Sequence, residues 1–240
     1  MTMFTANQKK VPASKNNQKD FCVIIPTVNE AETIGTILDK VKEFTDKILV
    51  VDGGSKDGTV EVAQQRGVQV VFDNKQGKGD ALRVGVDNTR SEIIVFIDAD
   101  GSHEISDIPK LVKPIQEGTA DLVVGSRIIG GSDELHGTFN KFIRNTGTNF
   151  LAVLVNKKWK TELSDIENGF RAIKRNVFKS INLKSPGFTI EQEMVLRCLK
   201  NNYKVMEVAS HEYARKSGYS KLKTIQGFRF LLHFFKEYLF

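Results

Sequence analysis

The stretch that decides the fold is Ile93-Ile94-Val95-Phe96-Ile97-Asp98-Ala99-Asp100, an apolar run followed by two carboxylates one residue apart. A short apolar run of this kind is typical of a strand that is buried on both faces. Because side chains at i and i+2 of a strand share a face, the pattern predicts that Asp98 and Asp100 converge just past the strand's end. Two carboxylates suit Mg²⁺ or Mn²⁺, with phosphate oxygens and water as further ligands. An isolated Asp-x-Asp is more often a turn or a helix cap, so the surrounding residues must decide.

Further apolar runs flank this one, and segments of helical pattern alternate with them. The sequence predicts strands over 21–26, 47–52, 68–72, 92–98 and 122–125, and helices over 30–44, 58–66, 78–88 and 106–117. Such alternation gives an α/β fold with a mostly parallel central sheet, flanked by helices and joined by right-handed crossovers. Ligands then bind past the carboxyl ends of the strands. After residue 126 the pattern predicts helices over 139–156, 190–201 and 221–240 and a strand over 203–209.

The composition is that of an ordinary globular protein, with 240 residues of which 40% are hydrophobic and 27% charged. We expect a disordered basic tail over 1–19, a globular domain over 20–220 and an amphipathic helix over 221–240. The sequence shows neither a signal-peptide pattern nor an apolar run of membrane-spanning length, so neither is expected. Cys22 and Cys198 lie in apolar segments and are expected to be reduced, in keeping with a cytosolic setting.

The net charge of +6 is concentrated at the two ends of the chain. Residues 1–19 hold lysines and no acidic residue, and residues 213–240 hold a single glutamate among several basic residues. Basic ends on a near-neutral body suit an anionic membrane surface. No RNA- or DNA-binding motif is present, so no nucleic-acid partner is expected. The phenylalanine-rich segment 228–240 favours an interfacial helix, with packing on the core or a dimer contact as the alternatives.

Three loops follow the predicted strands at the expected ligand edge. The first reads Pro26-Thr27-Val28-Asn29-Glu30, where Thr27 and Glu30 match a capping box and the helix start exposes amides that attract phosphate. The second reads Asp52-Gly53-Gly54-Ser55, and its carboxylate can accept hydrogen bonds from a base or ribose. The third, Gly77-Lys78-Gly79, can wrap a nucleotide and offers Lys78 as a mobile cation. Taken alone, the first loop is as well explained by a helix cap as by a ligand, Ser55 and Asp57 of the second can simply cap the next helix, and the third is more often a turn.

Together these motifs resemble those of the family 2 glycosyltransferases, which have the GT-A fold. Within that family the chain is most similar to the dolichyl-phosphate mannose and glucose synthases, over about residues 21–225. The matching segments are 26–30, 51–59, 77–79, 98–100, 124–127, 165–171, 188–194, 213–215 and 220–222. Mannose synthases often carry Leu-Gln after Asp-x-Asp, and this chain has Gly101-Ser102 there. That difference leaves the third metal ligand open and weakens the case for GDP-mannose.

The resemblance implies a metal-dependent, inverting transfer of a hexose from GDP-mannose or UDP-glucose to dolichyl or another polyprenyl phosphate. The lipid-linked sugar would serve in glycosylation. The enzyme would lie at the cytoplasmic face of a membrane, and whether a separate membrane-anchoring partner holds it stays open. Two alternatives remain: a GT-A glycosyltransferase with a non-lipid acceptor, and a nucleotide-binding module without catalysis.

The resemblance also assigns roles to individual residues. Asp98 and Asp100 would bind the metal and would form the catalytic set together with Arg127 and Arg215. The nucleotide sugar would be held by Pro26, Asn29, Glu30, Asp52, Lys78, Asp98, Ala99, Asp100, Asp165 and Glu191. The acceptor phosphate would be held by Arg127, Arg144, Thr148 and Lys221. Because that phosphate is already an anion, the site needs cations more than a strong base.

Two of the later residues have structural alternatives. Asp165 can be a simple turn residue, and Thr189 with Gln192 matches a second capping box.

Overall fold

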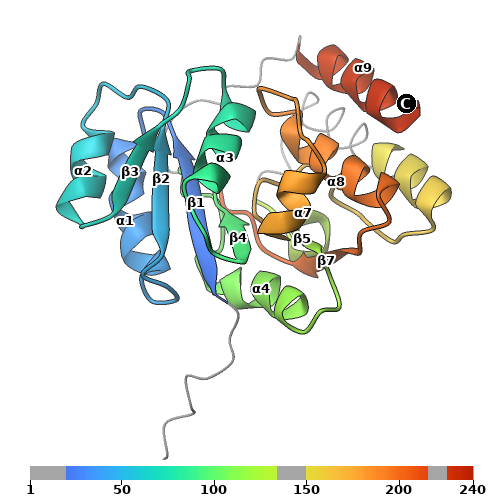
Figure 1. Cartoon of the computed structure of the whole chain (residues 1–240), viewed down its shortest axis with the longest axis horizontal. Coiled ribbons are helices and arrows are strands. Elements are labelled where there is room, and N and C mark those ends of the chain that lie inside the picture. The colour runs from blue at the N-terminus through green and yellow to red at the C-terminus, as the bar shows by residue number, and fades with distance from the viewer. Residues whose placement is uncertain (1–19, 134–149, 216–225, 240) are drawn as a thin grey trace, which may run out of the picture.

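The structure is a computed structural model that describes residues 20–133, 150–215 and 226–239. Its centre is a sheet in the order β3-β2-β1-β4-β6-β5-β7 (Figure 1). The strands are β1 (Phe21–Thr27), β2 (Ile48–Asp52), β3 (Gln69–Phe72), β4 (Ile93–Phe96), β5 (Leu122–Ser126), β6 (Arg171–Lys174) and β7 (Val205–Ala209). Every neighbouring pair is parallel except those that β6 makes with β4 and β5. The expected α/β class with a mostly parallel sheet is confirmed.

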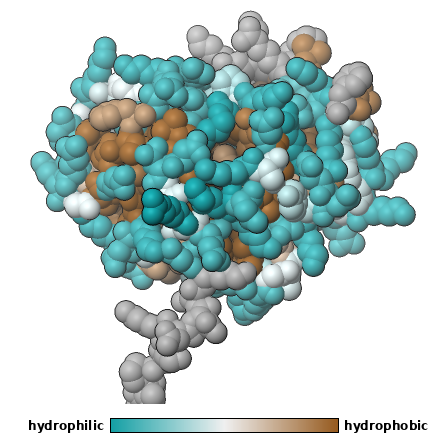
Figure 2. All heavy atoms as spheres, in the orientation of Figure 1, coloured by the Kyte–Doolittle hydropathy of each residue, from teal (hydrophilic) through white to brown (hydrophobic). Residues whose placement is uncertain are grey.

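Helices cover both faces of the sheet. One face carries α1 (Ala31–Val41), α2 (Thr59–Gln65) and α4 (Ile108–Gln116), and the other carries α3 (Lys78–Asp87), α7 (Arg175–Ser180) and α8 (Ile190–Lys200). Side chains of β1 alternate between the two cores, with Val23 and Ile25 on the first face and Cys22 and Ile24 on the second. Burial on both faces explains why the strands read as continuous apolar runs. Hydrophilic side chains cover most of the α3 and α8 side of the surface (Figure 2).

The antiparallel strand β6 is the main difference from the expected fold. It is inserted between β4 and β5, with Ala172 opposite both Val95 and Val123. Strand β6 has four residues, too few for the spacing of its apolar side chains to distinguish a strand from the start of a helix. Because β6 runs against its neighbours, its first residue, Arg171, lies at the edge where β4 and β5 end. Residues 165–170, which lead into β6, therefore reach that edge too.

The carboxyl-terminal helix α9 (Gln226–Leu239) packs against α8 and against a helical segment over 150–159. Phe234 is fully buried there, and the Tyr238 hydroxyl donates to the Leu154 carbonyl over 3.3 Å. Gln192 Nε2 donates to the Phe230 carbonyl over 3.1 Å. The capping box expected from Thr189 and Gln192 is therefore wrong, since the Gln192 amide turns to α9 and no side chain caps α8.

Three smaller observations complete the fold. Two short helical turns lie beside the ligand edge, η1 (Ile105–Asp107) and α5 (Arg127–Gly130). Cys22 and Cys198 are both buried free thiols, as expected. None of the helices in the described ranges has the length and apolar character needed to cross a membrane. The predicted tail over 1–19 lies outside the described residues.

Candidate active site

Asn29 and Asp52 fasten the first two loops of the ligand edge to each other. The Asn29 amide nitrogen donates to Ser55 Oγ, and its Oδ1 accepts from the Lys56 amide, both over 2.8 Å. Asp52 is buried and accepts from the amides of Gly54 and Ser55 over 2.8 and 2.9 Å. Both predicted donor-binding side chains thus shape the loops that would surround a ligand.

The first loop differs from the expected capping box. Thr27 Oγ1 donates to Asp52 Oδ2 over 3.3 Å, and no side chain caps the start of α1. The capping box of Thr27 and Glu30 is therefore wrong. Glu30 is buried at the first turn, where its amide donates to Thr59 Oγ1 over 2.9 Å. Pro26 lies within β1, opposite Val51 of β2.

The Asp-x-Asp motif lies in a turn, because β4 ends at Phe96. The strand-alternation argument for Asp98 and Asp100 is therefore wrong, and the two carboxylates have different partners. Asp98 contacts the Lys78 ammonium, and its Oδ2 lies 3.5 Å from His103 Nε2. Asp100 Oδ1 accepts from Ser102 N and Oγ over 3.0 and 2.7 Å.

Two further contacts fix this turn. Arg215 Nε lies 3.4 Å from Asp100 Oδ2, which places a predicted catalytic cation directly beside the motif. Ala99 is buried, and its carbonyl accepts from Thr33 Oγ1 of α1 over 2.5 Å. The turn is thus held from α1 on one side and from the chain near residue 215 on the other.

Charge compensation dominates around Asp98. Burial raises the pKa of a carboxyl, but Lys78 and His103 oppose it and hold the pKa of Asp98 well below its usual range. Burial likewise lowers the pKa of an amine, but Asp98 and Glu191 raise the pKa of Lys78 above its usual range. Both groups are therefore charged at neutral pH. Glu191 Oε1 lies 2.7 Å from Lys78 Nζ, so one buried cation serves two acids.

Asp98 and Asp100 have the donor chemistry of a divalent-cation site. Mg²⁺ is usually bound by one or two carboxylates, while substrate phosphates and water supply the other oxygens. Within residues 20–133, 150–215 and 226–239, no group of three or more His, Cys, Asp or Glu side chains lies close enough to hold a metal. The two aspartates therefore fit a divalent cation whose remaining ligands include oxygens of a bound diphosphate. A third protein ligand for such a cation stays unassigned.

The Gly77-Lys78-Gly79 loop starts α3 against the segment 185–187. The Asp80 amide donates to the carbonyls of Gly77 and Pro186 over 3.0 and 3.2 Å. Gly77 has a φ of 107°, which favours glycine. A Cβ atom at Gly79 would lie 2.1 Å from the Ser185 carbonyl oxygen. This close backbone packing directs the Lys78 side chain into the site.

Replacing Gly79 by alanine is expected to lower the free energy of unfolding by about 1–3 kcal/mol, the cost of overpacking a tight contact. The added methyl meets backbone atoms of Ser185 and Pro186, which cannot swing away as a side-chain tip can. Urea denaturation would measure the change. Gly187→Ala is the matched control, since a Cβ there meets nothing within 4 Å. Equal stability of the two variants would contradict this packing argument.

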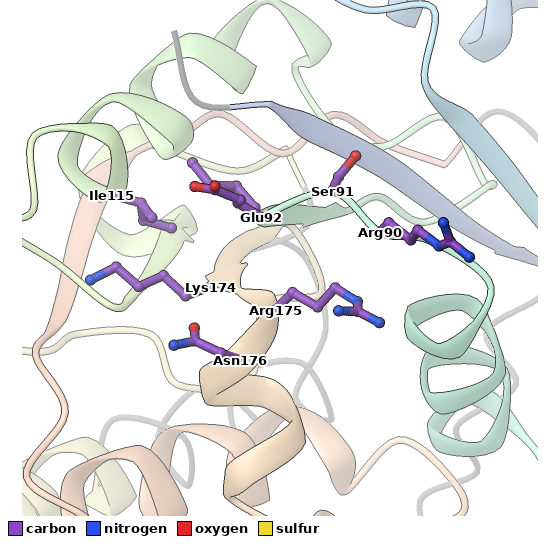
Figure 3. A pocket seen from close by; sticks show the side chains of 8 residues that line it. Arg90, Ser91, Glu92, Ile115, Lys174, Arg175 and Asn176 are labelled. Carbon is purple, nitrogen blue, oxygen red and sulfur yellow. The ribbon is translucent and has the colours of Figure 1, made fainter. Parts of the chain in front are cut away.

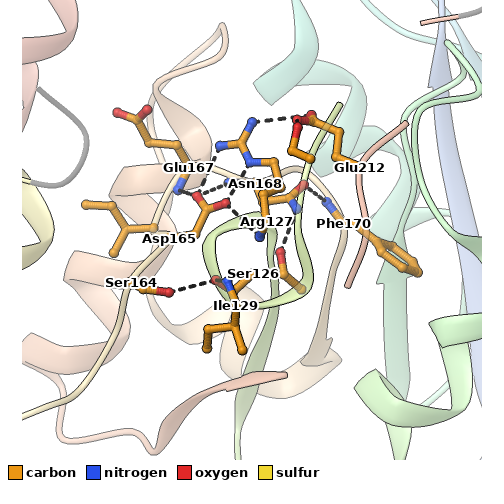
Figure 4. A network of polar contacts seen from close by, with 12 residues as sticks. Ser126, Arg127, Ile129, Ser164, Asp165, Glu167, Asn168, Phe170 and Glu212 are labelled. Carbon is orange, nitrogen blue, oxygen red and sulfur yellow. Dashed lines mark hydrogen bonds and ion pairs between the residues drawn. The ribbon is translucent and has the colours of Figure 1, made fainter. Parts of the chain in front are cut away.

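Arg127 is held at the amino end of α5 by an acidic network (Figure 4). Its Nε and Nη2 atoms bind Asp165 Oδ2 and Oδ1 over 2.6 and 3.1 Å, and Nη1 lies 3.3 Å from Glu212 Oε1. Burial opposes the charge, but Asp165 raises the pKa of Arg127 above its usual range. Arg127 is neither a solvated surface residue nor a free cation: its side chain is 23% exposed and already paired.

Asp165 is an organiser of this network. It is 1% exposed, and its Oδ1 accepts from the amides of Glu167 and Asn168 over 3.1 Å each. Asn168 in turn ties β5 to the segment that leads into β6, because its side chain donates to the Gly125 carbonyl over 2.5 Å and accepts from the Phe170 amide over 3.0 Å. The structure thus supports the ordering role of Asp165 and shows it to be more than a turn residue.

Sequence reasoning missed four residues that support the site. Glu207 of β7 accepts from the amides of Ser164 and Asp165, and Glu212 binds both Arg127 and Ser132. His103 stacks on Phe170 with ring centroids 5.2 Å apart. The buried Arg171 guanidinium donates to the carbonyls of Asn168 and Glu191 over 2.9 and 2.7 Å. His103, three residues after Asp100, and Arg171, at the end of the matching segment 165–171, carried a positional signal in the sequence.

Three predicted acceptor-binding residues, Arg144, Thr148 and Lys221, lie outside the described residues. A cavity of about 420 Å³ lies elsewhere, at the opposite edge of the sheet (Figure 3). It is lined by Arg90, Ser91, Glu92, Ile93, Ile115, Lys174, Arg175 and Asn176. It shares no residue with the predicted site, so it is separate from the edge where the three ligand-edge loops meet.

Comparisons with known proteins identify a family and a shared fold. The model of the glycosyl transferase family 2 matches residues 22–181. Glycosyltransferase AglJ of Haloferax volcanii is 35% identical over 82% of this chain, which spans 64% of the length of that relative. The polyprenol monophosphomannose synthase of Mycolicibacterium smegmatis is 31% identical over 88% of this chain and 84% of its own. Among solved structures, glucosyl-3-phosphoglycerate synthase from Mycobacterium tuberculosis has a TM-score of 0.69 at 22% identity, covering 90% of this chain and 78% of that one.

Proposed function

Because the chain belongs to glycosyl transferase family 2 and has the GT-A fold, we propose that it transfers a hexose from a nucleotide sugar to a polyprenyl phosphate. The donor would be GDP-mannose or UDP-glucose, and the acceptor would be dolichyl phosphate or a related lipid. The product would be a lipid-phosphate-linked sugar for use in glycosylation. Mg²⁺ or Mn²⁺ would assist.

The observation that carries this proposal is the gathering of cations around two carboxylates at one sheet edge. Lys78 contacts Asp98, and Arg215 lies 3.4 Å from Asp100. Arg127 follows β5 at the same edge. A reaction between two phosphate-bearing substrates requires this balance, because the two anions repel one another unless the site neutralises them.

The reaction itself needs no strong base. An oxygen of the acceptor phosphate attacks the anomeric carbon, a new carbon–oxygen bond forms, and the bond to the diphosphate breaks as the nucleoside diphosphate leaves. In-line attack on an α-linked donor gives a β-linked product. Arg215 and Lys78 would neutralise the leaving diphosphate, and Arg127 would receive the acceptor phosphate through its fork of donors. Asp165 and Glu212 fix where that fork points.

Asp98 and Asp100 would hold the divalent cation. When bound, the cation supplies Lewis-acid stabilisation of the charge that develops on the diphosphate. Ser102 and Thr33 hold the turn in place from within the protein, so the carboxylates are oriented before a donor arrives.

The lipid acceptor calls for a membrane-facing surface, and adjacent helices offer one. Apolar side chains are exposed on α9 at Leu232 and Leu239 and on the segment 150–159 at Phe150 and Val153. Such a surface suits an interfacial position. Together with the name of the polyprenol-dependent relative, it supports a peripheral location at the cytoplasmic face of a membrane. The two buried free cysteines fit a reducing compartment.

Transfer of radiolabelled sugar into organic-extractable lipid would test the proposal. The purified chain would be incubated with dolichyl phosphate in vesicles and Mg²⁺ or Mn²⁺, with GDP-mannose, UDP-glucose and UDP-N-acetylglucosamine in parallel. Metal-dependent lipid label from one donor is the expected result, and it names the sugar. Label that stays in the aqueous phase would replace the lipid with a soluble acceptor. Donor binding without any transfer would reduce the chain to a nucleotide-binding module.

A further inference from the structure

Lys78 is the one side chain that bridges the Asp-x-Asp motif and α8 in the described structure. Its ammonium contacts Asp98 and lies 2.7 Å from Glu191 Oε1, and its side chain is only 9% exposed. Gly169 makes room for this contact, because a Cβ atom there would lie 2.6 Å from both Asp98 Oδ2 and Lys78 Nζ. The chain therefore provides its own cation at the carboxylate that is expected to bind a metal.

Such a cation competes with a metal ion for Asp98. The ammonium occupies one carboxylate oxygen, and a second, divalent charge beside it would be repelled strongly in a buried setting. Moving Lys78 out of the site without a replacement cation is also unfavourable. It would leave Asp98 and Glu191 as neighbouring acids without a counter-charge. A metal can bind well only when another anion draws Lys78 away from Asp98.

Glu191 is arranged to keep Lys78 inside the site when it leaves Asp98. Its side chain is 4% exposed, and its Oε2 atom has no hydrogen-bond partner among the described residues. A buried carboxylate oxygen without a partner is costly, so it favours any arrangement that brings a donor to it. Lys78 can therefore move from Asp98 towards Glu191 and the donor diphosphate without passing into solvent.

We propose that Lys78 is a built-in counter-cation that blocks metal binding at Asp98 until the diphosphate of the donor arrives and takes over its charge. This inference rests on the proposed function, in that the ligand is taken to be a nucleoside diphosphate. Metal and nucleotide then bind cooperatively. By thermodynamic linkage, each raises the affinity of the protein for the other by the same factor. The enzyme would thereby avoid holding a metal ion in the absence of donor.

Electron paramagnetic resonance of free Mn²⁺ would test this without any transfer assay. The full chain, without nucleotide, would be titrated with Mn²⁺ as wild type and as Lys78→Met. We expect the variant to bind Mn²⁺ roughly tenfold or more tightly than wild type. Lys75→Met is the matched control, since it removes the same charge from the loop just before α3, where no ion pair with Asp98 forms, and it should leave the affinity unchanged. Equal Mn²⁺ affinity of Lys78→Met and wild type would overturn the proposal.

A second pair of variants guards against loss of folding. In Glu191→Gln, Lys78 keeps Asp98 as its only acidic partner, so Mn²⁺ alone should bind no more tightly than to wild type. Adding Lys78→Met to Glu191→Gln leaves Asp98 without its ammonium partner and should raise Mn²⁺ affinity above that of Glu191→Gln. No rise in the double variant would refute the blocking role. Neither Mn²⁺ titration depends on which acceptor the enzyme uses. The role of Lys78 and the proposed transfer reaction are therefore tested by independent experiments.

Discussion

Replacing Asp98 by asparagine is expected to lower kcat/KM for sugar transfer by about 10³-fold or more, the scale reached when a key electrostatic group is removed from a reacting centre. Asparagine keeps the size of the side chain but removes the charge that pairs with Lys78 and that would bind a divalent cation. The leaving diphosphate would then depart without the ion that stabilises it. Initial rates of label transfer to lipid, at saturating metal, would measure the loss.

The control for this variant is Asp39→Asn, which removes a carboxylate on the exposed side of α1. Asp39 pairs with Arg66 over 3.0 Å and is 60% exposed. We expect its kcat/KM to equal that of wild type. Circular dichroism of Asp98→Asn should match the wild-type spectrum. Retention of more than a tenth of wild-type activity in Asp98→Asn would rule out Asp98 as a metal ligand required for transfer.

Replacing Asp165 by alanine is expected to lower the free energy of unfolding by about 3–5 kcal/mol, the cost of removing one partner from a buried ion pair. The change would leave the Arg127 guanidinium without its bidentate acceptor and would free the amides of Glu167 and Asn168. Those amides begin the segment that enters β6, so the sheet edge should loosen as well. Urea denaturation at neutral pH would measure the loss.

Asp39→Ala provides the comparison for an exposed ion pair, and it should cost about 1 kcal/mol or less. Asp165→Asn separates charge from shape, since an amide can still accept from the backbone while the ion pair is lost. We expect the stability of Asp165→Asn to lie between those of wild type and Asp165→Ala. We also expect a higher KM for the acceptor, because the Arg127 guanidinium loses the carboxylate that fixes its orientation. If Asp165→Ala were as stable as Asp39→Ala, the network in Figure 4 would not be holding the site together.

The amino-terminal half of the fold could be predicted from sequence because its signals are local. Strands β1, β2 and β4 of that half are apolar runs buried on both faces, and each loop that follows has a distinctive composition. The predicted ends agree with the structure within a few residues, and the small error in the strand before Asp98 is the one that changes an argument about the site. Its apolar run continues through Ile97, which is buried but lies outside the strand, so burial alone did not mark where pairing stops.

The second half was harder because its contacts are remote in sequence. Arg127 takes its position from Asp165 and Glu212, which are far along the chain. Glu207 of β7 accepts a hydrogen bond from the Asp165 amide. The local sequence of β7 does not indicate that this strand pairs with β5. The antiparallel strand β6 is short and lacks a periodic signature. Motif resemblance placed most of these segments in the site, but only the folded sheet shows which of their side chains hold one another.

The insertion of β6 also sets the order in which a newly made chain can assemble. Strands β3, β2, β1 and β4 are neighbours in the sheet, so they can pair with one another once residue 96 has been made. Only the outer edge of β4 then still lacks its partner, β6. Strand β5 has no neighbour in the sheet except β6 and β7, and β6 is complete only about 50 residues later. At roughly 5–20 residues per second, translation leaves the β4 edge unpaired for several seconds. During that interval the nascent chain presents an open strand edge on which chaperones or neighbouring nascent chains can act.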